Sequence, residues 1–162
     1  MKITTYKSNP KTTAEIVDLV NFCQNIEAGL GITMAEQYDL FEIENHYQKI
    51  GGQFWTAIED DKVVGTISLL PLNSDTAVLK KFFTYPDFRG EPEYLGKKLY
   101  EEFIEFAKEH NFKTIVLDSP GSQKRAHHFY RNQGFKEVTE DELTVSWSYP
   151  HSNSKFFQLD LK

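Results

Sequence analysis

The order of strands and helices expected along this chain predicts a mixed α/β (α+β) fold, in which helices flank one central sheet. Short β-rich runs bounded by turn residues alternate with longer segments whose apolar residues recur at helical spacing. The resulting order is β-α-α-β-β-β-α-β-α-β-β. At 162 residues the chain is long enough to bury one sizeable core, and we expect a single domain over residues 1–162.

The N-terminal segment is expected to form one strand and two helices. Residues 3–6 are typical of a short strand, and Thr12-Thr13-Ala14-Glu15 has the capping-box pattern that begins a helix. That helix is expected to reach about Glu27. A second helix, ended by Gly51-Gly52, is predicted by apolar residues that share one helical face, namely Leu40, Ile43, Tyr47 and Ile50.

Further strands are expected on both sides of the middle of the chain. Residues 53–59 and 62–70 are predicted to form a hairpin whose tight turn is Asp60-Asp61. Towards the C-terminus we expect a strand over 137–147, a loop over Tyr149 to Ser154, and a last strand over 156–161.

A strand–loop–helix unit in the middle of the chain has the features of an anion site. Residues 76–84 are β-rich, and Tyr85-Pro86 ends the strand because proline has no N–H for a ladder. Arg89-Gly90 follows, and a helix opens near Gly96 with one apolar face, formed by Leu95, Leu99, Phe103, Phe106 and Ala107. Free backbone N–H groups at such a helix start attract anions, and Arg89 and Lys97 add positive charge.

The spacing therefore predicts a phosphate or pyrophosphate site, although an ordinary strand-to-helix turn fits the same spacing. There is no GxGxxG after the strand and no GxxxxGK[ST]. Neither a Rossmann fingerprint nor a P-loop is supported.

The residues after this helix form a second motif. TIVLD (114–118) predicts a strand, and QKRAHHFYRNQGF follows at 123–135. Together, LKKFFTYPDFRG…LGKKL and QKRAHHFYRNQGF resemble the GNAT superfamily of acyl-CoA-dependent N-acyltransferases, whose second motif is N-x-x-A-x-x-x-Y-x-x-x-G-F. Gln123 stands where that family usually has Asn, and the matching residues are Ala126, Tyr130, Gly134 and Phe135. The resemblance implies a GNAT-type central mixed, mostly antiparallel sheet.

The same resemblance implies an enzyme that transfers an acetyl group from acetyl-CoA to a primary amine, by direct attack in a ternary complex. The strand ending at Thr84 would splay from the strand beginning near Thr114, and the acyl-pantetheine arm would lie in that gap. By position, the backbone N–H of Phe82 would polarise the thioester carbonyl, and Thr84 would bond the pantetheine amides. The implied acetyl-CoA-binding residues are Phe82, Phe83, Thr84, Arg89, Gly90, Tyr94, Leu95, Gly96, Lys97, Gln123 and Tyr130.

Tyr130 takes the position of the family's general acid, which protonates the departing CoA thiolate. The alternative is a core aromatic on an amphipathic helix. Five residues could accept the proton of the attacking amine, although a solvated surface group is the favoured reading of each: Glu42, Glu44, His46, Asp118 and His127. Acceptor choice is expected from residues 29–52 and from the Tyr149 to Ser154 loop. Aromatic residues that could shape an acceptor pocket are Tyr38, Phe41, Tyr47, Trp55 and Tyr149.

Two departures from the family pattern keep other functions open. The loop between Arg89 and Gly96 is two residues longer than usual, with Tyr94 where a Gly is common, and Glu91 and Glu93 would repel a pyrophosphate unless they point to solvent. A second reading is therefore a catalytically inactive acyl-CoA-binding or regulatory GNAT-fold module, and a third is a globular domain with no CoA site. Thiol release with some amine would discriminate between the first two.

Composition and charge exclude several classes of protein. The net charge is −6, from 18 basic and 24 acidic residues, and no Lys/Arg run exceeds two, which argues against a nucleic-acid or anionic-membrane surface. An acidic body suits a cationic acceptor. The single Cys23 excludes an intramolecular disulfide and a Cys-cluster metal site, and His127-His128 lacks a third ligand, so we expect no metal. No apolar stretch approaches membrane-spanning length and no signal segment is evident, so we expect a cytoplasmic protein, with a homodimer as one option.

Overall fold

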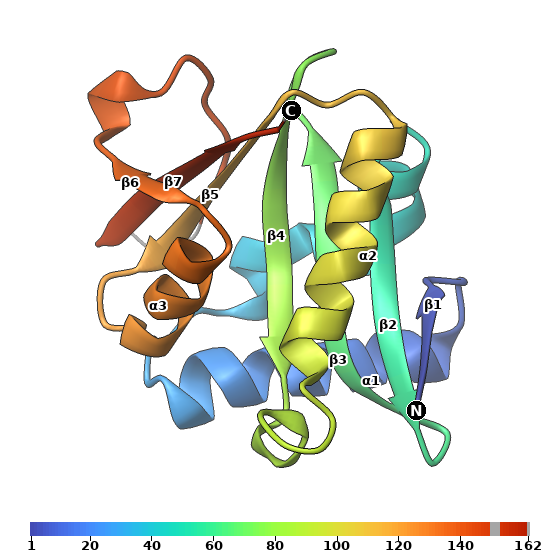
Figure 1. The fold of residues 1–162 in the computed structure, drawn as a ribbon. Helices are drawn as coiled ribbons and strands as arrows, with labels where there is room; N and C mark the ends of the chain where they lie inside the picture. Colours follow the sequence, from blue (N-terminus) through green and yellow to red (C-terminus); the bar gives the residue numbers. More distant parts are fainter. Residues whose placement is uncertain (150–152, 162) are drawn as a thin grey trace.

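A single sheet of strands organises the structure, a computed structural model that describes residues 1–149 and 153–161 (Figure 1). Within these residues the strand order is β1-β2-β3-β4-β5-β7-β6. Neighbouring strands pair antiparallel except β4 and β5, which are parallel. The strands are β1 (Lys2–Thr5), β2 (Gln53–Glu59), β3 (Lys62–Pro71), β4 (Thr76–Thr84), β5 (Thr114–Pro120), β6 (Lys136–Val138) and β7 (Ser154–Asp160).

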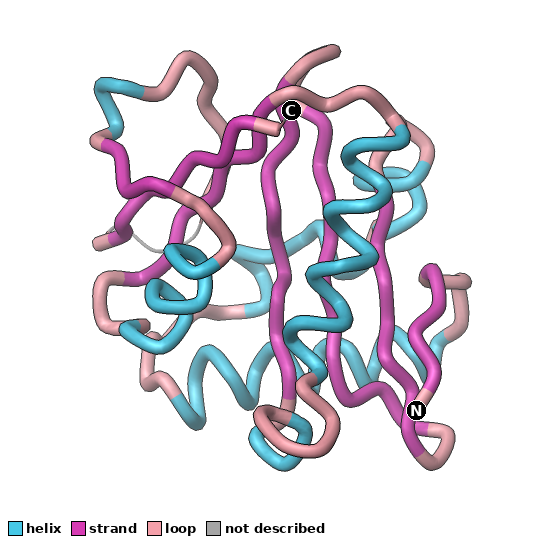
Figure 2. The backbone as a smooth tube through the Cα atoms, in the orientation of Figure 1, coloured by secondary structure: helices cyan, strands magenta, loops and turns pink. Residues whose placement is uncertain are grey.

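Helices cover both faces of this sheet (Figures 1 and 2). Helix α1 (Pro10–Asn21) crosses one face and continues as a π-helical turn over Phe22–Glu27. Helices α2 (Leu95–Glu109) and α3 (Lys124–Asn132) lie on the other face. Shorter helical segments are Met34–Phe41, Glu44–Gln48, Pro86–Phe88 and Glu140–Glu142.

Each face of the sheet has its own apolar core. Four of the five residues of the predicted apolar face of α2 are completely buried, namely Leu95, Leu99, Phe103 and Ala107, whereas Phe106 is partly buried. On the opposite face Ile16, Leu19 and Val20 of α1 pack with Leu40 and Tyr47 of the following segments. Full burial of side chains of this size contributes about 1.5–3 kcal/mol each to folding. The helices are thereby held at fixed positions on both sides of β4.

Strands β4 and β5 pair only at their beginnings. The parallel register covers Thr76↔Thr114, Ala77↔Ile115 and Val78↔Val116. On the other edge of β4, the register with β3 passes from Thr66↔Phe83 to Ser68↔Lys80, so that two residues of β4 stand opposite one of β3. This is a β-bulge, which bends a strand and increases its twist. The implied splay of the two strands is therefore present.

Several boundaries differ from those expected. Helix α1 is capped by Asn9, whose Oδ1 accepts hydrogen bonds from the backbone N–H groups of Lys11 (2.8 Å) and Thr12 (3.4 Å), with Pro10 at the first helical position. The predicted Thr12 capping box is wrong, because Glu15 instead accepts from the N–H of Val63 at 3.2 Å. The helix does extend to Glu27, as predicted, by way of the π-helical turn.

The predicted second helix is replaced by two short helical segments. Gln37 leaves the helical region at φ −129°, and Asp39 accepts a hydrogen bond from the Tyr47 hydroxyl at 2.6 Å, which is a tertiary contact that helical spacing does not encode. The predicted strand over 137–147 is also mostly wrong. It ends at Val138, because Thr139 and Glu142 form a capping box there.

The helices within residues 1–149 and 153–161 include none with the length and hydrophobicity that a membrane-spanning helix requires.

Candidate active site

The gap between β4 and β5 opens into a cavity of about 540 Å³. Its walls come from β4, the start of α2, α3 and the end of the α1 segment. Apart from Leu95, all the residues expected to bind acetyl-CoA line it. The Leu95 side chain is fully buried in the core, where a Cβ added to Gly65 would approach it to 2.8 Å. A larger residue at position 65 would have to displace the Leu95 side chain, so glycine favours the close packing of α2 on β3.

The N-terminus of α2 has the free backbone N–H groups that an anion site requires. Tyr94 precedes the helix with left-handed backbone angles (φ 45°, ψ 48°), and no side chain caps this end. Among the described residues, the backbone N–H groups of Leu95, Gly96 and Lys97 have no acceptor. Unpaired N–H groups and the positive end of the helix dipole favour a phosphate at this point.

The two extra carboxylates of this loop do not face the cavity. Glu91 is exposed, and the Glu93 carboxylate lies 3.6 Å from Nζ of Lys98. Neither residue lines the cavity. The repulsion that these residues would exert on a pyrophosphate is therefore reduced by their orientation and by solvent.

Arg89 is engaged by protein groups rather than open to a phosphate. Its Nη1 and Nη2 donate to the two carboxylate oxygens of Glu27 at 2.7 and 2.8 Å, and Nη2 also donates to the Thr84 carbonyl at 2.6 Å. Its Nε donates to Thr84 Oγ1 at 3.1 Å. The hydrogen bonds from Arg89 hold the pKa of Glu27 below its usual value. Of the two predicted basic groups, only Lys97 is exposed and remains available for a phosphate.

These contacts also occupy Thr84. Besides the bonds from Arg89, its carbonyl accepts from the Cys23 thiol at 3.5 Å. Both oxygens of Thr84 therefore already accept hydrogen bonds from protein groups, and the expected bonds from Thr84 to the pantetheine amides stay a prediction. Cys23 lies in the π-helical turn after α1 and is buried in the core on that face, and burial raises the pKa of its thiol to about 11.

Tyr130 lines the cavity, and its ring is packed among other aromatic rings. Its ring contacts Phe82, Phe135 and Phe157, with centroid distances of 6.4, 5.7 and 5.8 Å. The hydroxyl makes no hydrogen bond to any described residue. Burial raises the pKa of Tyr130 far above the usual value for a phenol, so the group stays protonated at neutral pH. The phenol therefore holds the proton that a general acid must donate, while its raised pKa makes it a weaker acid than an exposed tyrosine.

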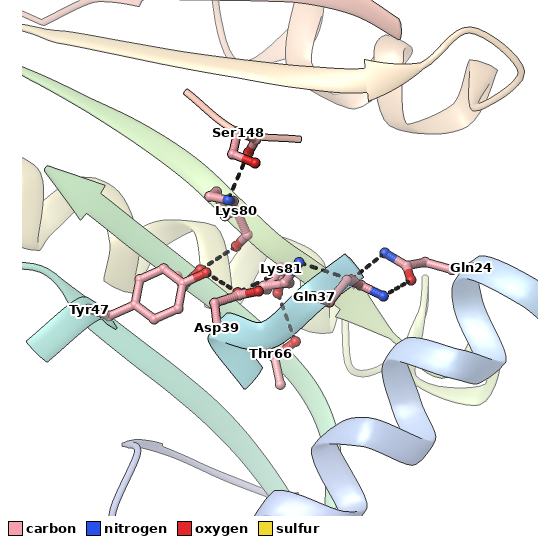
Figure 3. Close-up of polar contacts among 9 residues, drawn as sticks. Gln24, Gln37, Asp39, Tyr47, Thr66, Lys80, Lys81 and Ser148 are labelled. Atoms are coloured by element: carbon pink, nitrogen blue, oxygen red, sulfur yellow. Dashed lines mark hydrogen bonds and ion pairs between the residues drawn. The ribbon is translucent and has the colours of Figure 1, made fainter. Parts of the chain in front are cut away.

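A buried polar cluster beside the bulge was not predicted (Figure 3). Lys81 lies in the bulge at φ 52° and is 8% exposed. Its Nζ donates to Gln37 Oε1 at 2.9 Å and lies 3.7 Å from Asp39 Oδ2. Gln37 is completely buried and exchanges two amide hydrogen bonds with Gln24, at 2.9 and 2.7 Å. Burial lowers the pKa of Lys81 to about 8.

One signal in the sequence could have revealed this cluster. Lys80-Lys81 interrupts an otherwise apolar strand, and consecutive strand residues normally point to opposite faces. The bulge allows both lysines to line the cavity. Hydroxyl groups of β3 donate hydrogen bonds to the backbone carbonyls of the bulge. Ser68 donates to the Lys80 carbonyl and Thr66 donates to the Lys81 carbonyl, both at 2.8 Å.

Of the five candidate proton acceptors, only Asp118 lines the cavity. Its Oδ1 accepts from the Trp147 indole N–H at 2.8 Å, and burial raises its pKa. Glu42 and Glu44 are exposed elsewhere. His127 is buried with Nε2 3.0 Å from the Pro120 carbonyl. His46 packs on Tyr47 with a buried Nε2 that has no partner among the described residues.

The aromatic residues proposed to shape an acceptor pocket are mostly elsewhere. Tyr149 lines the cavity, and its hydroxyl donates to Glu140 at 3.0 Å. Tyr47 and Trp55 belong to the two cores, whereas Tyr38 and Phe41 are exposed. From residues 29–52, Leu30 and Ile32 line the cavity. Residues 150–152 of the expected Tyr149 to Ser154 loop lie outside the described residues.

Comparison with known proteins decides the family. A model of the acetyltransferase (GNAT) family matches residues 21–135, which is more than half of the chain. The chain belongs to the GNAT family of acetyltransferases. An acetyltransferase structure from Streptococcus agalactiae is 54% identical with a TM-score of 0.96, covering 99% of this chain and 98% of that one. The predicted family, GNAT fold and acetyltransferase class are confirmed.

Curated relatives of this GNAT chain are longer proteins. The N-acetylaspartate synthetase of Xenopus tropicalis is 32% identical over 125 residues, which are 75% of this chain and 45% of that protein. The chain thus spans less than half the length of that relative. The same fold occurs in a GNAT family acetyltransferase from Elizabethkingia anophelis solved with acetyl-CoA bound, at 16% identity and a TM-score of 0.65, covering 99% of this chain and 97% of that one.

Proposed function

We propose that this protein is an N-acetyltransferase that transfers the acetyl group of acetyl-CoA to a primary amine by direct attack in a ternary complex, with residues 1–162 acting as one GNAT domain. One observation carries the proposal. A single cavity joins the uncapped N-terminus of α2, the splayed end of β4 and Tyr130, whose hydroxyl has no hydrogen-bond partner in the described part of the chain. A family neighbour with acetyl-CoA bound and a relative named for N-acetylaspartate, an acetylated amino acid, support it.

The pyrophosphate of acetyl-CoA is assigned to the start of α2. The backbone N–H groups of residues 95–97 and the Lys97 ammonium would bind its oxygens. Gly90, Tyr94 and Gln123, which line the same region, would complete the wall. Arg89 contributes through its backbone and by bracing the loop, because its guanidinium is already neutralised by Glu27.

The thioester end is assigned to the bulge of β4. Lys81 and Phe82 have no partner residue in the registers with β3 and β5, so the N–H of Phe82 is a candidate donor to the thioester carbonyl. A backbone donor in a rigid bulge is oriented before negative charge develops on that oxygen, which is the condition for electrostatic stabilisation.

The proton transfers are assigned to Tyr130 and Asp118. The amine nitrogen forms a bond to the acetyl carbon as the C–S bond breaks, and Tyr130 gives its hydroxyl proton to the sulfur. The Asp118 carboxylate accepts the proton lost by the amine. Its raised pKa makes it a better base than an exposed carboxylate. Solvent then restores the proton of Tyr130.

Calorimetric titration with acetyl-CoA, a thermal melt with and without it, and thiol detection with a panel of primary amines test this proposal. Ligand at about 100 times its dissociation constant should stabilise the fold by roughly 2.7 kcal/mol. Binding with thiol release supports the enzyme. Binding without release for any amine would favour an inactive acyl-CoA-binding or regulatory module, and no binding would favour a domain without a CoA site. Gel filtration and cell fractionation test the accompanying proposals of a homodimer and a cytoplasmic location.

A further inference from the structure

We propose that the amine acceptor also carries a carboxylate, as an α-amino acid does, and that Lys80 and Lys81 bind this carboxylate. The inference rests on the proposed function, whose acceptor it narrows to amino-acid-like zwitterions. It comes from the charges that line the cavity beside the bulge, where the acetyl group would lie.

The charges at this end of the cavity are unequal. Glu27 and Asp118 are the acidic residues among those that line it. Glu27 is neutralised by its two hydrogen bonds from Arg89. Asp118 is therefore the one acidic residue of this wall, among the described residues, that Arg89 does not neutralise. Asp39, which does not line the cavity, lies 3.7 Å from Nζ of Lys81. The wall itself thus carries two ammonium groups beside one carboxylate, and a substrate carboxylate would give the lysines a partner that a neutral or purely cationic amine does not provide.

Lys81 is positioned before any ligand arrives. The reciprocal amide pair of Gln24 and Gln37 fixes which way the Gln37 amide points, and its oxygen accepts from Nζ of Lys81. Asp39 lies farther from the ammonium, at 3.7 Å, and its nearer oxygen already accepts from the Tyr47 hydroxyl at 2.6 Å. An ammonium has three N–H donors, and Gln37 takes one at hydrogen-bond distance. Burial lowers the pKa of Lys81 even though the Asp39 carboxylate favours the charged form.

Lys80 offers a second ammonium from the same wall. Its Nζ donates to the Ser148 carbonyl at 3.1 Å (Figure 3), which leaves donors for a ligand. A regular strand would direct Lys80 and Lys81 to opposite faces of the sheet, and only the bulge lets both line one cavity. Two ammonium groups can hold the two oxygens of one carboxylate by charge-assisted hydrogen bonds.

Asp118 supplies the complementary group for the amine. It lines the cavity with the two lysines and is fixed by the Trp147 indole. The charges of Asp39, Lys80 and Asp118 act on the pKa of Lys81, and the charges of Asp39 and both lysines act on the pKa of His46. A zwitterion with its ammonium at Asp118 and its carboxylate at the lysines would satisfy both signs of charge.

The test is binding of matched acceptors to the full chain saturated with CoA, measured by calorimetry. Each L-amino acid in a panel is paired with its primary amide and with the amine that lacks the carboxylate. We expect the amino acids to bind roughly tenfold or more tightly than their partners, since a hydrogen bond to a charged group contributes about 1.5–3 kcal/mol. Lys80→Met and Lys81→Met should each remove most of this difference while acetyl-CoA still binds.

Lys108→Met is the matched control, because Lys108 is an exposed lysine in the last turn of α2 and does not line the cavity. It should preserve the preference. If Lys81→Met fails to fold, Lys80→Met carries the test, because Lys80 is only half-buried. Equal binding of both members of each pair, lysine variants that weaken both members equally, or no binding of any amino acid would each overturn the inference. Thiol release with amines that lack a carboxylate would then leave the proposed acetyl transfer intact, whereas failure to bind acetyl-CoA would remove that proposal itself.

Discussion

Arg89 donates hydrogen bonds to both carboxylate oxygens of Glu27, at 2.7 and 2.8 Å, although the two residues are 62 positions apart in the sequence. Through the same guanidinium Arg89 also reaches Thr84 at the end of β4. One side chain thus ties the end of the α1 segment, β4 and the loop before α2 together. This places Arg89 as a brace of the cavity wall.

Arg89→Met should therefore destabilise the fold by about 1–3 kcal/mol, because it removes several charge-assisted hydrogen bonds and leaves Glu27 without its partner. Urea unfolding measures the change. Glu27→Gln should lose less stability than Arg89→Met, and the loss of stability in the double variant should be smaller than the sum of the two single losses. Additive losses would mean that the ion pair contributes nothing of its own. A far larger loss of acetyl-CoA affinity than of stability would show that Arg89 binds phosphate directly.

Tyr130→Phe should lower kcat by about a hundredfold or more and leave acetyl-CoA affinity nearly unchanged, because it removes the proton donor and keeps the packed ring. Steady-state thiol release and calorimetry measure the two quantities. Tyr100→Phe is the matched control, since Tyr100 is buried in the same aromatic cluster and does not line the cavity. An unchanged kcat for Tyr130→Phe would exclude Tyr130 as the general acid.

Lys81 should impose a pH dependence on stability in the alkaline range. Its folded pKa of about 8 lies below the ordinary value of 10.5, because burial disfavours the charged form. Below pH 8 the ammonium is charged in both states and its burial opposes folding. Between pH 8 and 10.5 the unfolded chain holds a proton that the folded chain has released, so the free energy of unfolding gains a term that rises with pH.

Lys81→Met should remove this rising term. Urea unfolding of wild type and variant across the same window would measure it as a difference between two slopes. Lys108→Met, an exposed lysine, should follow the wild type. Parallel wild-type and Lys81→Met curves would mean that Lys81 keeps an ordinary pKa in the folded protein.

Tyr94→Gly should stabilise the fold by roughly 0.5–1 kcal/mol, because a left-handed conformation is unfavourable for a residue with a Cβ and not for glycine. The φ of 45° at this position is the observation behind the prediction. Thermal and urea unfolding measure the gain. Asn111→Gly is the comparison, because Asn111 also has a positive φ, of 64°, but lies outside the cavity. Of the two substitutions, only Tyr94→Gly should also alter acetyl-CoA binding. A loss of stability in Tyr94→Gly would contradict the claim that the left-handed conformation of Tyr94 is unfavourable.

The sequence by itself determined the elements that local chemistry controls. The strands predicted over residues 53–59 and 76–84 have the bounds of β2 and β4. Periodicity identified the buried face of α2, and Pro86 marked the end of β4. These features depend on residues a few positions apart, so the order along the chain contains them. Two motifs at fixed spacing were likewise enough to indicate the family.

The tertiary structure alone decided which long polar side chains meet. Lys81 donates a hydrogen bond to Gln37, which is 44 positions away in the sequence, and Gln37 in turn accepts a hydrogen bond from Gln24. Arg89 pairs with Glu27 rather than remaining open to phosphate. A flexible charged side chain can reach many partners, and its choice depends on which segments the fold brings together and which of them bury the pair away from water. The bulge at Lys81 directs two consecutive lysines toward one cavity. It depends on the pairing between β3 and β4 and not on the residues of β4 alone.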